Sequence, residues 1–407
     1  MTLVRWCIVA ALVGCGGDKA LVADSDSAVE TEAKTDSAID TDADAEIEPE
    51  AVADTAIETT VDGVETEAET TPNSWALLVA SYDRLETVAG RGTQRDKGNE
   101  WLASYEGGPA KSSELSRPHM AMADSQGRIF IADKEAHGIR RVDRDGTIHT
   151  VAGTNVAGDD GDTPGPATTK RLTDPNGLYV LGNDVVHILD QGNGKVRRLA
   201  TDGTLTTLFA VPGGIDTGRG LWVAEDESAA FVASGEKLLR WQADVGVKVY
   251  AQGFVELGNL VVDPDGLLVA TDRGGHRVYR VAPNGTKTAI AGNGTMTGGG
   301  DGAPALSSGL NEPRAVWFLP KDIGGGYLVG THEGNQVWYV DPAGLLHLFL
   351  DGGDGHAHSG DGQYFRTPGQ KVSEVRAITM APNGDILVTE NDYGFIRRVL
   401  RRQAPAD

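Results

Sequence analysis

Between residues 118 and 153, short apolar runs alternate with turn-forming residues. The apolar runs are MAMA, RIFIA, GIRRV and TIHTVA, and the segments between them are DSQG, DKEAHG and DRDG. Runs of about 4–8 residues bounded by Asp and Gly are typical of strands, and short separators join such strands as hairpins. This segment is therefore predicted to be a four-stranded antiparallel meander.

The same pattern recurs along the rest of the chain. Further copies occupy residues 175–210, 218–253 and 257–292, and two more begin at Pro313 and Glu374. The third copy is degenerate, and the last one stops after three strands. A single supersecondary unit cannot bury its apolar face alone, so repeats of this length stack on one another.

The missing strand of the last repeat has a candidate at the other end of the repeat array. Residues 84–90, RLETVAG, match TIHTVAG, the fourth strand of the first repeat. If they supply the outer strand of the last repeat, the ring closes and no sheet edge is left free at the seam. The sequence thus predicts an all-β, six-bladed β-propeller of four-stranded antiparallel blades.

The repeats carry shared marks. In the first copy these are Asp124 and Gly127, then Ala132-Asp133, Arg140-Arg141-Val142 and Asp145-Gly146-Thr147, and the second and fourth copies keep most of them. They resemble the repeats of the NHL family over about residues 84–402, and the resemblance implies the propeller fold. It says little about function, because propellers host many functions. The acid after the second strand is expected to accept N–H groups of the turn that follows, at Asp133, Asp190 and Asp272, with Ser234, Thr331 and Glu390 as weaker substitutes.

Charge is distributed unevenly along the chain. The formal net charge is −23, yet residues 18–74 hold 18 acidic side chains and two lysines, and residues 75–407 carry only −8. A mildly acidic body argues against a nucleic-acid partner, whose phosphates need a basic face. The body also lacks cysteine, since Cys7 and Cys15 are the two in the chain.

The N-terminus has the layout of a secretion signal. Arg5 precedes an apolar run from Trp6 to Val13, and small residues follow. Residues 12–15, LVGC, resemble the bacterial lipobox, which implies a signal peptide over residues 1–14 and a lipid anchor on Cys15; an ordinary signal peptide with an incidental cysteine is the alternative. Residues 15–74 are expected to be a disordered acidic linker that tethers a propeller over residues 75–407. The implied location is the bacterial cell envelope, at the outer membrane or cell surface.

The first strand of each blade lines the axis of a propeller, so the residue just before its apolar run is expected at the channel mouth. The six copies place there His119, Asn176, Arg219, Gly258, Arg314 and Arg376. Converging arginines repel one another unless an anion or carboxylates intervene. This ring is a candidate site for an anionic ligand. The alternative is that the arginines pair with acids such as Asp174, Glu312 or Glu374, or extend to solvent.

Four of the junctions between blades carry long inserts, at residues 91–117, 154–174, 293–312 and 353–373. All occupy the same type of junction, so they are expected over one face of the disc and to form a binding surface there. Asp159, Asp160 and Asp162 offer oxygen ligands for calcium, or they form tight turns. His356 and His358 have zinc-like spacing, but no third ligand stands nearby, and a solvated loop is the alternative.

Motifs of known enzymes are missing. The chain has no H-E-x-x-H, G-x-S-x-G or phosphate-binding loop, and the other histidines are expected on outer strands or hairpin turns. The predicted function is a non-enzymatic binding scaffold that contacts a protein, a peptide or an envelope polysaccharide, with no bound cofactor. The alternative is a metal-dependent lyase or lactonase with its metal on the axis, as in other six-bladed propellers.

Overall fold

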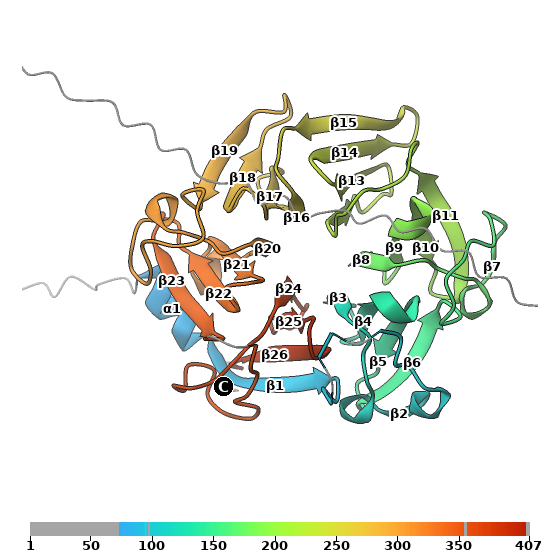
Figure 1. Cartoon of the computed structure of the whole chain (residues 1–407), viewed down its shortest axis with the longest axis horizontal. Helices are drawn as coiled ribbons and strands as arrows, with labels where there is room; N and C mark the ends of the chain where they lie inside the picture. The colour runs from blue at the N-terminus through green and yellow to red at the C-terminus, as the bar shows by residue number, and fades with distance from the viewer. Residues whose placement is uncertain (1–72, 94, 97, 354–355, 404–407) are drawn as a thin grey trace, which may run out of the picture. The chain divides into compact units, whose positions relative to one another are not determined.

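The computed structural model describes residues 73–403 apart from 94, 97, 354 and 355. The predicted signal peptide, Cys15 and almost all of the predicted linker therefore lie outside the described residues. The described strands form six antiparallel sheets that surround a common axis (Figure 1). This arrangement confirms the predicted six-bladed β-propeller.

Each repeat forms one blade. Blade 1 contains β3 (Pro118–Ala123), β4 (Ile129–Asp133), β5 (Gly138–Val142) and β6 (Thr147–Ala152). Blade 2 contains β8 (Pro175–Val180), β9 (Val186–Asp190), β10 (Lys195–Leu199) and β11 (Thr204–Ala210). Blade 3 contains β12 (Leu221–Val223), β13 (Ala229–Ser234), β14 (Lys237–Gln242) and β15 (Gly246–Gln252).

The other half of the ring is built in the same way. Blade 4 contains β16 (Leu257–Val262), β17 (Leu268–Asp272), β18 (Arg277–Val281) and β19 (Lys287–Ala291). Blade 5 contains β20 (Pro313–Phe318), β21 (Tyr327–Thr331), β22 (Gln336–Val340) and β23 (Leu346–Asp351). Blade 6 contains β24 (Val375–Met380), β25 (Ile386–Glu390), β26 (Phe395–Arg401) and β1 (Tyr82–Ala89).

Helical segments are short. The described residues contain one α-helix, α1 (Ser74–Ala80), which Asn73 caps by accepting a hydrogen bond from the Ala76 N–H. The 3₁₀ turns are η1 (Ala103–Tyr105), η2 (Ala110–Ser112), η3 (Lys134–Ala136), η4 (Ala167–Thr169), η5 (Gln191–Asn193), η6 (Ala305–Ser307) and η7 (Lys321–Ile323). No helix in this part of the chain is long and apolar enough to cross a membrane.

The Asp-x-x-Gly marks form the hairpin turns. The Asp124 carboxylate accepts hydrogen bonds from the backbone N–H groups of Gln126 (3.0 Å) and Arg128 (2.9 Å). Gly127 has a φ of +75°, a left-handed conformation that glycine adopts without a steric cost. Asp263 of blade 4 accepts in the same way from Asp265 and Leu267, so the Asp and Gly of these two repeats set the reversal between the first two strands of their blades.

The seam of the ring closes as the sequence predicts. Strand β1 pairs antiparallel with β26, in a register that places Leu85 opposite Val399. Tyr82, Leu85 and Ala89 of β1 are fully buried. The strand observed at residues 82–89 overlaps the predicted 84–90, and it protects the edge that β26 would otherwise expose.

The core is divided among the interfaces between blades. Neighbouring blades contribute to six apolar clusters, one at each interface around the ring. Each cluster holds buried residues of two adjacent blades, such as Phe130 and Leu178, Leu189 and Leu221, Leu238 and Leu260, Val269 and Val316, Leu328 and Ile378, and Ile131 and Ile396. Each blade is therefore stabilised by both neighbours, and the ring positions the inner strands rigidly.

Short segments of the inserts lie at the outer edges of the blades and not, as was expected, over one face of the ring. Gly108–Pro109 (β2) pairs with β6, and Gly165–Pro166 (β7) pairs with β11, so each adds a short fifth strand to the outer edge of a blade. The third insert makes an isolated bridge from Pro304 to Leu345 at the equivalent edge. The prediction that the inserts lie wholly over one face is therefore wrong for these short segments. They cover the outer edges of the blades and so protect them against pairing with the edges of other sheets.

The acid that ends the second strand binds the segment leading into the first strand more than it binds the following turn. Asp133 accepts from the Ser116 N–H (2.5 Å), and Asp190 accepts from the Thr173 N–H (2.8 Å). Asp272 accepts from Glu256 (3.0 Å) and also from Gly275 in the turn that follows (3.2 Å). These carboxylates are structural, but their main partner is the segment that enters the first strand.

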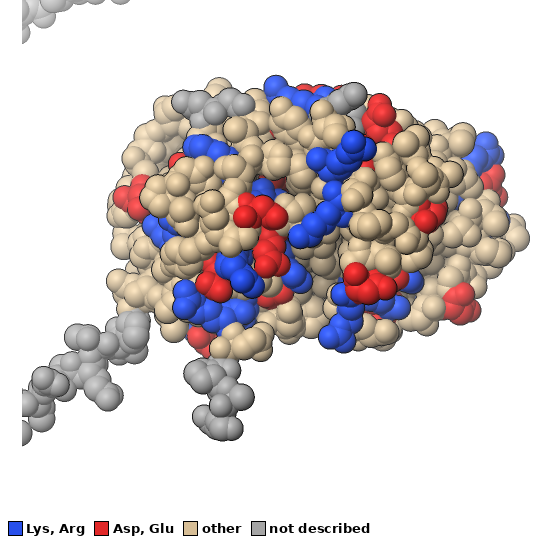
Figure 2. Space-filling model, turned by 90° about the horizontal axis from the view of Figure 1, so that it is seen from below, with Lys and Arg blue, Asp and Glu red and all other residues tan. Residues whose placement is uncertain are grey.

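Charged side chains are mixed on the outside of the propeller. Figure 2 shows Lys and Arg interspersed with Asp and Glu over the side that it displays. That side has no continuous basic surface of the kind that a nucleic-acid backbone needs.

Candidate functional site

Five of the six predicted ring residues stand at bulges of the inner strands, whereas Arg219 lies just before β12. In blade 1, Pro118 pairs with Asp133 and Met120 with Ala132, so His119 has no partner in the ladder. The same irregularity occurs at Asn176, Arg314 and Arg376. A bulge bends the strand and changes the direction of a side chain. The inner strands thus direct a polar residue out of the ladder at the end where they begin, which we call the channel mouth.

The histidine and the asparagine of the ring contact each other. His119 Nδ1 is in contact with Asn176 Oδ1, and both side chains are buried. Asn176 Nδ2 donates to Gln191 Oε1 and to the Gly218 carbonyl, both at 2.6 Å. Burial, followed by the charges of Arg219 and Lys134, holds the pKa of His119 well below its usual value. His119 is therefore a neutral hydrogen-bonding residue at neutral pH.

Two of the three ring arginines have carboxylate partners. Arg314 Nη2 donates to Glu312 Oε2 at 3.2 Å, and Arg376 Nη2 donates to Glu374 Oε2 at 3.4 Å and to Asn391 Oδ1 at 2.9 Å. Burial, and then Arg273, lowers the pKa of Arg314 to about 10. The pairing alternative is thus correct for these two arginines.

Asp174 differs from the other two proposed acids. It lies 4.0 Å from Lys134 Nζ and 3.7 Å from His137 Nδ1. Its described ion pairs are therefore with these two residues and not with a ring arginine.

Arg219 is the exception in the ring. Its side chain is in no hydrogen bond or ion pair with any described residue, and the residue is only 9% exposed. Its Nε and Nη1 atoms are buried without a partner. Burial, and then the charges of Arg314 and Arg273, depresses its pKa well below the usual value. The nearby charge of Glu256 acts in the opposite direction on this pKa, but Glu256 forms no ion pair with Arg219. Among the described residues, the buried guanidinium therefore lacks the direct anionic partner that such groups require.

A second layer of charged residues surrounds the ring. Glu312 accepts from Arg273 Nε at 2.8 Å as well as from Arg314. Glu374 Oε2 lies 2.9 Å from His332 Nε2. Burial alone would raise the pKa of Glu374, but the hydrogen bond and charge of His332 lower it to about 2. Both glutamates are therefore ionised at neutral pH.

His332 was not recognised as a residue of the mouth. The sequence places it in the turn after a second strand, which is correct, but that turn buries it between Glu312 and Glu374. The pairing of β20 with β21 explains why His332 lies at the mouth. The end of each second strand pairs with the start of the first, so the residue after β21 lies beside the residues that enter β20.

The three candidate calcium ligands do not point to one centre. Asp159 and Asp162 both contact Lys195 Nζ, at 2.8 and 3.0 Å, whereas Asp160 pairs with Arg171 at 2.7 Å. The hydrogen bonds from these cations contribute to lowering the pKa of all three carboxyl groups. A cation bound by all three would have to displace Lys195 and Arg171.

The two histidines of the fourth insert separate. His358 packs on the ring of Phe395 with a centroid distance of 3.8 Å, and burial lowers its pKa to about 4. His356 instead lies beside two carboxylates, with Nδ1 3.5 Å from Glu374 Oε1 and 3.6 Å from Asp392 Oδ2. The two histidines therefore do not share one site, and the carboxylates beside His356 come from positions 18 and 36 residues further along the chain.

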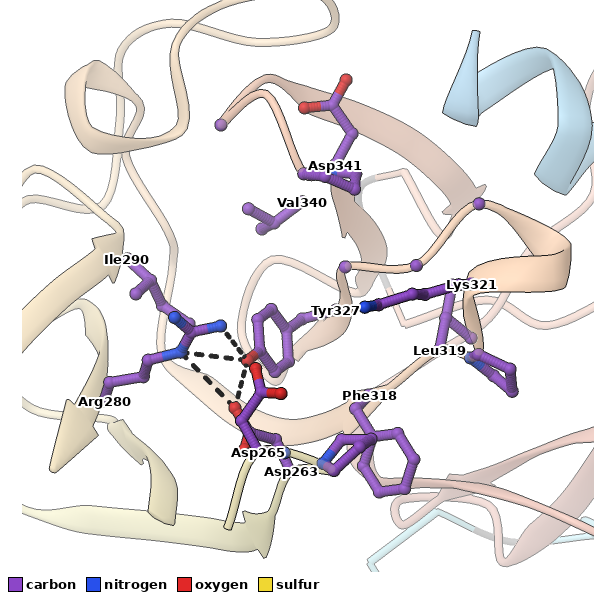
Figure 3. Close-up of a pocket in the computed structure, with 17 residues that line it drawn as sticks. Asp263, Asp265, Arg280, Ile290, Phe318, Leu319, Lys321, Tyr327, Val340 and Asp341 are labelled. Carbon is purple, nitrogen blue, oxygen red and sulfur yellow. Dashed lines mark hydrogen bonds and ion pairs between the residues drawn. The ribbon is translucent and has the colours of Figure 1, made fainter. Parts of the chain in front are cut away.

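A cleft that the sequence did not predict lies between blades 4 and 5. It has a volume of about 690 Å³ and is lined by the turns at residues 263–265 and 324–326 (Figure 3). Arg280 Nη2 donates to Tyr327 Oη at 2.6 Å, and Tyr327 Oη donates to Asp263 Oδ2 at 2.7 Å. The turn that joins β16 to β17 lies at the end of these strands opposite to the mouth, so the cleft and the arginine ring are separate features.

Comparison with known proteins supports the fold. No protein-family model matches the chain, and no curated protein matches it. A protein of unknown function from Bacteroides thetaiotaomicron is 14% identical, with 79% of this chain and 76% of that chain covered and a TM-score of 0.60. An auxiliary nutrient binding protein from the same species is 13% identical, with 79% and 77% covered and a TM-score of 0.56.

A gluconolactonase from Xanthomonas campestris is also similar. It is 15% identical, with 80% of this chain and 93% of that chain covered and a TM-score of 0.50. Identities this low show a shared six-bladed propeller and do not transfer an activity, because the same fold hosts both binding proteins and enzymes.

Proposed function

We propose that this protein is a non-enzymatic binding scaffold that holds an anionic group of its partner at the channel mouth. The observation that carries the proposal is the buried Arg219, whose side chain lacks a carboxylate partner among the described residues. Burying a charge without compensation is costly, and a bound anion would remove that cost. Such a residue is typical of a ligand site and not of a stabilising core.

Neighbouring arginines suit the same ligand. Arg314 also has buried Nε and Nη1 atoms without hydrogen-bond partners, and Arg376 has a buried free Nε. The planar guanidinium matches carboxylate and phosphate in paired, bidentate hydrogen bonds. His119 and Asn176 complete the ring with neutral polar groups, which would orient the anion without opposing its charge.

The partner we favour is a protein, a peptide or an envelope polysaccharide that carries acidic groups. A similar solved structure is that of an auxiliary nutrient binding protein, which is compatible with a binding role for the fold. The lipobox resemblance supports an anchor on Cys15 at the outer membrane or cell surface, with the acidic linker as the tether. Cys15→Ser should then move the protein from the membrane fraction to the soluble fraction.

Calorimetric titration of the full chain tests the mouth. The probes are oligogalacturonate, an acidic polysaccharide fragment, and a poly-glutamate peptide. Comparing their affinities shows whether the mouth binds carboxylates of a polysaccharide or those of a peptide. Hydrogen bonds to charged groups contribute about 1.5–3 kcal/mol, so Arg219→Met should weaken binding roughly 10- to 150-fold. Arg84→Met is the matched control, because Arg84 is 52% exposed on the rim strand β1. Equal binding of both acids by wild type and Arg219→Met would contradict the proposal.

A metal-dependent lyase or lactonase is the alternative function. It would place its metal on the axis, where the inner ring offers one histidine and no carboxylate. We therefore favour the non-enzymatic binding scaffold over the metal-dependent enzyme. Metal-dependent turnover of a lactone that Arg219→Met leaves unchanged would favour the alternative.

A further inference from the structure

Three acidic or histidine side chains from distant segments meet beside the channel mouth. His356 belongs to the fourth insert, Glu374 directly precedes β24, and Asp392 lies in the turn after β25. Glu374 and Asp392 are buried, and the Nδ1 atom of His356 is buried without a hydrogen-bond partner. One imidazole nitrogen and two carboxylate oxygens thus lie close to one another.

The spacing of these atoms fits a metal better than hydrogen bonds. His356 Nδ1 lies 3.5 Å from Glu374 Oε1 and 3.6 Å from Asp392 Oδ2, and it makes a hydrogen bond to neither. Zinc binds nitrogen and oxygen at about 2.0–2.1 Å in a tetrahedron, which separates its ligand atoms by roughly 3.3 Å. The observed separations are close to that value.

Both carboxylates also make hydrogen bonds to residues outside this group. His332 Nε2 contacts the second oxygen of Glu374, at 2.9 Å. Ser373 Oγ donates to Asp392 Oδ2 at 2.6 Å, and the Tyr393 N–H donates to Asp392 Oδ1 at 2.8 Å. Outer-shell contacts of this kind orient the ligands of a metal in advance.

A second group of similar composition is already saturated. Glu312, His332 and Glu333 also lie close together. Both oxygens of Glu312, however, accept hydrogen bonds from Arg273, at 2.8 and 3.2 Å. A metal there would compete with a bidentate arginine, so the group around His356 is the better candidate.

An exposed cation now lies against the His356 group. Arg95 of the first insert places Nη2 3.3 Å from Glu374 Oε1 and Nε 3.8 Å from Asp392 Oδ2. Its side chain is 42% exposed, so it can turn to solvent with little loss of packing. Arg95 therefore neutralises the two carboxylates that a metal would use.

We propose that His356, Glu374 and Asp392 bind a divalent transition metal of the zinc class, which displaces Arg95. Imidazole combined with carboxylates suits zinc and similar ions, and three protein ligands leave a fourth position open to water. The site adjoins the ring of arginines, because Arg376 Nη2 donates to the second oxygen of Glu374 at 3.4 Å. Metal binding there does not depend on the proposed function.

Titration of the metal-free full chain with Zn²⁺, in competition with a chromophoric chelator, tests the site. We expect the wild type to bind one Zn²⁺ ion tightly per chain. His356→Ala should weaken it by more than the roughly 10- to 100-fold that loss of an outer-shell partner costs, and His332→Gln should weaken it within that range. Arg95→Gln should tighten it, because the competing cation is removed.

His358→Ala is the matched control, since His358 belongs to the same insert and packs against the ring of Phe395 instead of the two carboxylates. It should bind Zn²⁺ as the wild type does. His356 has a side chain that is 23% exposed, so its substitution should leave the fold intact, which circular dichroism verifies. Absence of a tight equivalent, or unchanged binding by His356→Ala, would overturn the proposal; so would equal losses in His356→Ala and His358→Ala.

Discussion

Two buried arginines should respond to the same substitution with opposite changes in stability. Arg219 is in no ion pair with a described residue, whereas the Nε atom of Arg140 donates to Asp133 Oδ2 at 3.0 Å. Both residues are almost inaccessible, with 9% and 0% exposure. Arg→Met keeps most of the apolar length of the side chain and removes the charge. Arg219→Met should therefore stabilise the ligand-free protein, and Arg140→Met should destabilise it.

The expected magnitudes follow from the environment of each charge. Replacing buried charges by apolar side chains of similar volume can stabilise a protein by about 1–4 kcal/mol. We expect the free energy of unfolding of Arg219→Met to rise by an amount in this range. Removing one partner of a buried ion pair costs about 3–5 kcal/mol, because the other charge stays buried. Arg140 also stacks over Trp101, with its guanidinium carbon 3.7 Å from the ring centroid, which adds up to about 2 kcal/mol when such a contact is desolvated.

Urea unfolding followed by tryptophan fluorescence measures both changes as free energies of unfolding. Oligogalacturonate at a hundred times the wild-type Kd should stabilise the wild type by about 2.7 kcal/mol. Arg219→Met, which should bind it roughly 10- to 150-fold more weakly, should gain only about 0.3–1.4 kcal/mol. A loss of stability in Arg219→Met comparable to that in Arg140→Met would refute the reasoning, because Arg219 would then have a compensating partner in the folded protein.

Two further predictions concern the ring seam and a buried acid. Leu85→Ala in the closing strand should cost about 2–5 kcal/mol, since Leu85 is fully buried between blades 5 and 6, and Arg84→Ala next to it should change stability by less than about 0.5 kcal/mol. Equal effects of the two in urea unfolding would contradict the seam assignment. Burial raises the pKa of Glu390 to about 7, so its ionisation opposes folding above that pH. The wild type should thus gain stability relative to Glu390→Gln as the pH falls from 8 towards 5; a difference independent of pH in the same assay would contradict this.

The fold was predictable because its determinants are local and repeated. Each copy contains its own alternation and its own Asp-Gly turns, so strand positions in blade 1 agree with the sequence pattern to within a residue or two. The closing strand was found because it resembles the fourth strand of another repeat. The inserts have no such period. Their short pairings with the outer strands depend on contacts between segments that the pattern of one repeat does not contain.

The positions of the ring residues could be predicted from the sequence, but most of the side chains that surround them at the channel mouth could not. Aligning the repeats identified the ring residues, and Glu312 and Glu374 were named as possible partners of their arginines, yet the bulges in the inner strands were not evident. Arg95 and His356 reach the mouth from inserts, and Asp392 reaches it from a turn. Only the three-dimensional register brings such residues together, because they share no spacing in the chain.

The unpaired state of Arg219 has an origin in the sequence, and it suggests a reciprocal test. Arg314 and Arg376 each pair with a glutamate two residues earlier, but the residue two before Arg219 is the exposed Thr217. Thr217→Glu would supply the missing carboxylate. It should stabilise the ligand-free protein by about 1.5–3 kcal/mol, the value of a hydrogen bond to a charged group, and weaken binding of acidic probes. Thr217→Gln, which adds the length without the charge, should do neither. If Thr217→Glu bound oligogalacturonate and poly-glutamate as tightly as the wild type, the anion would not be held by Arg219.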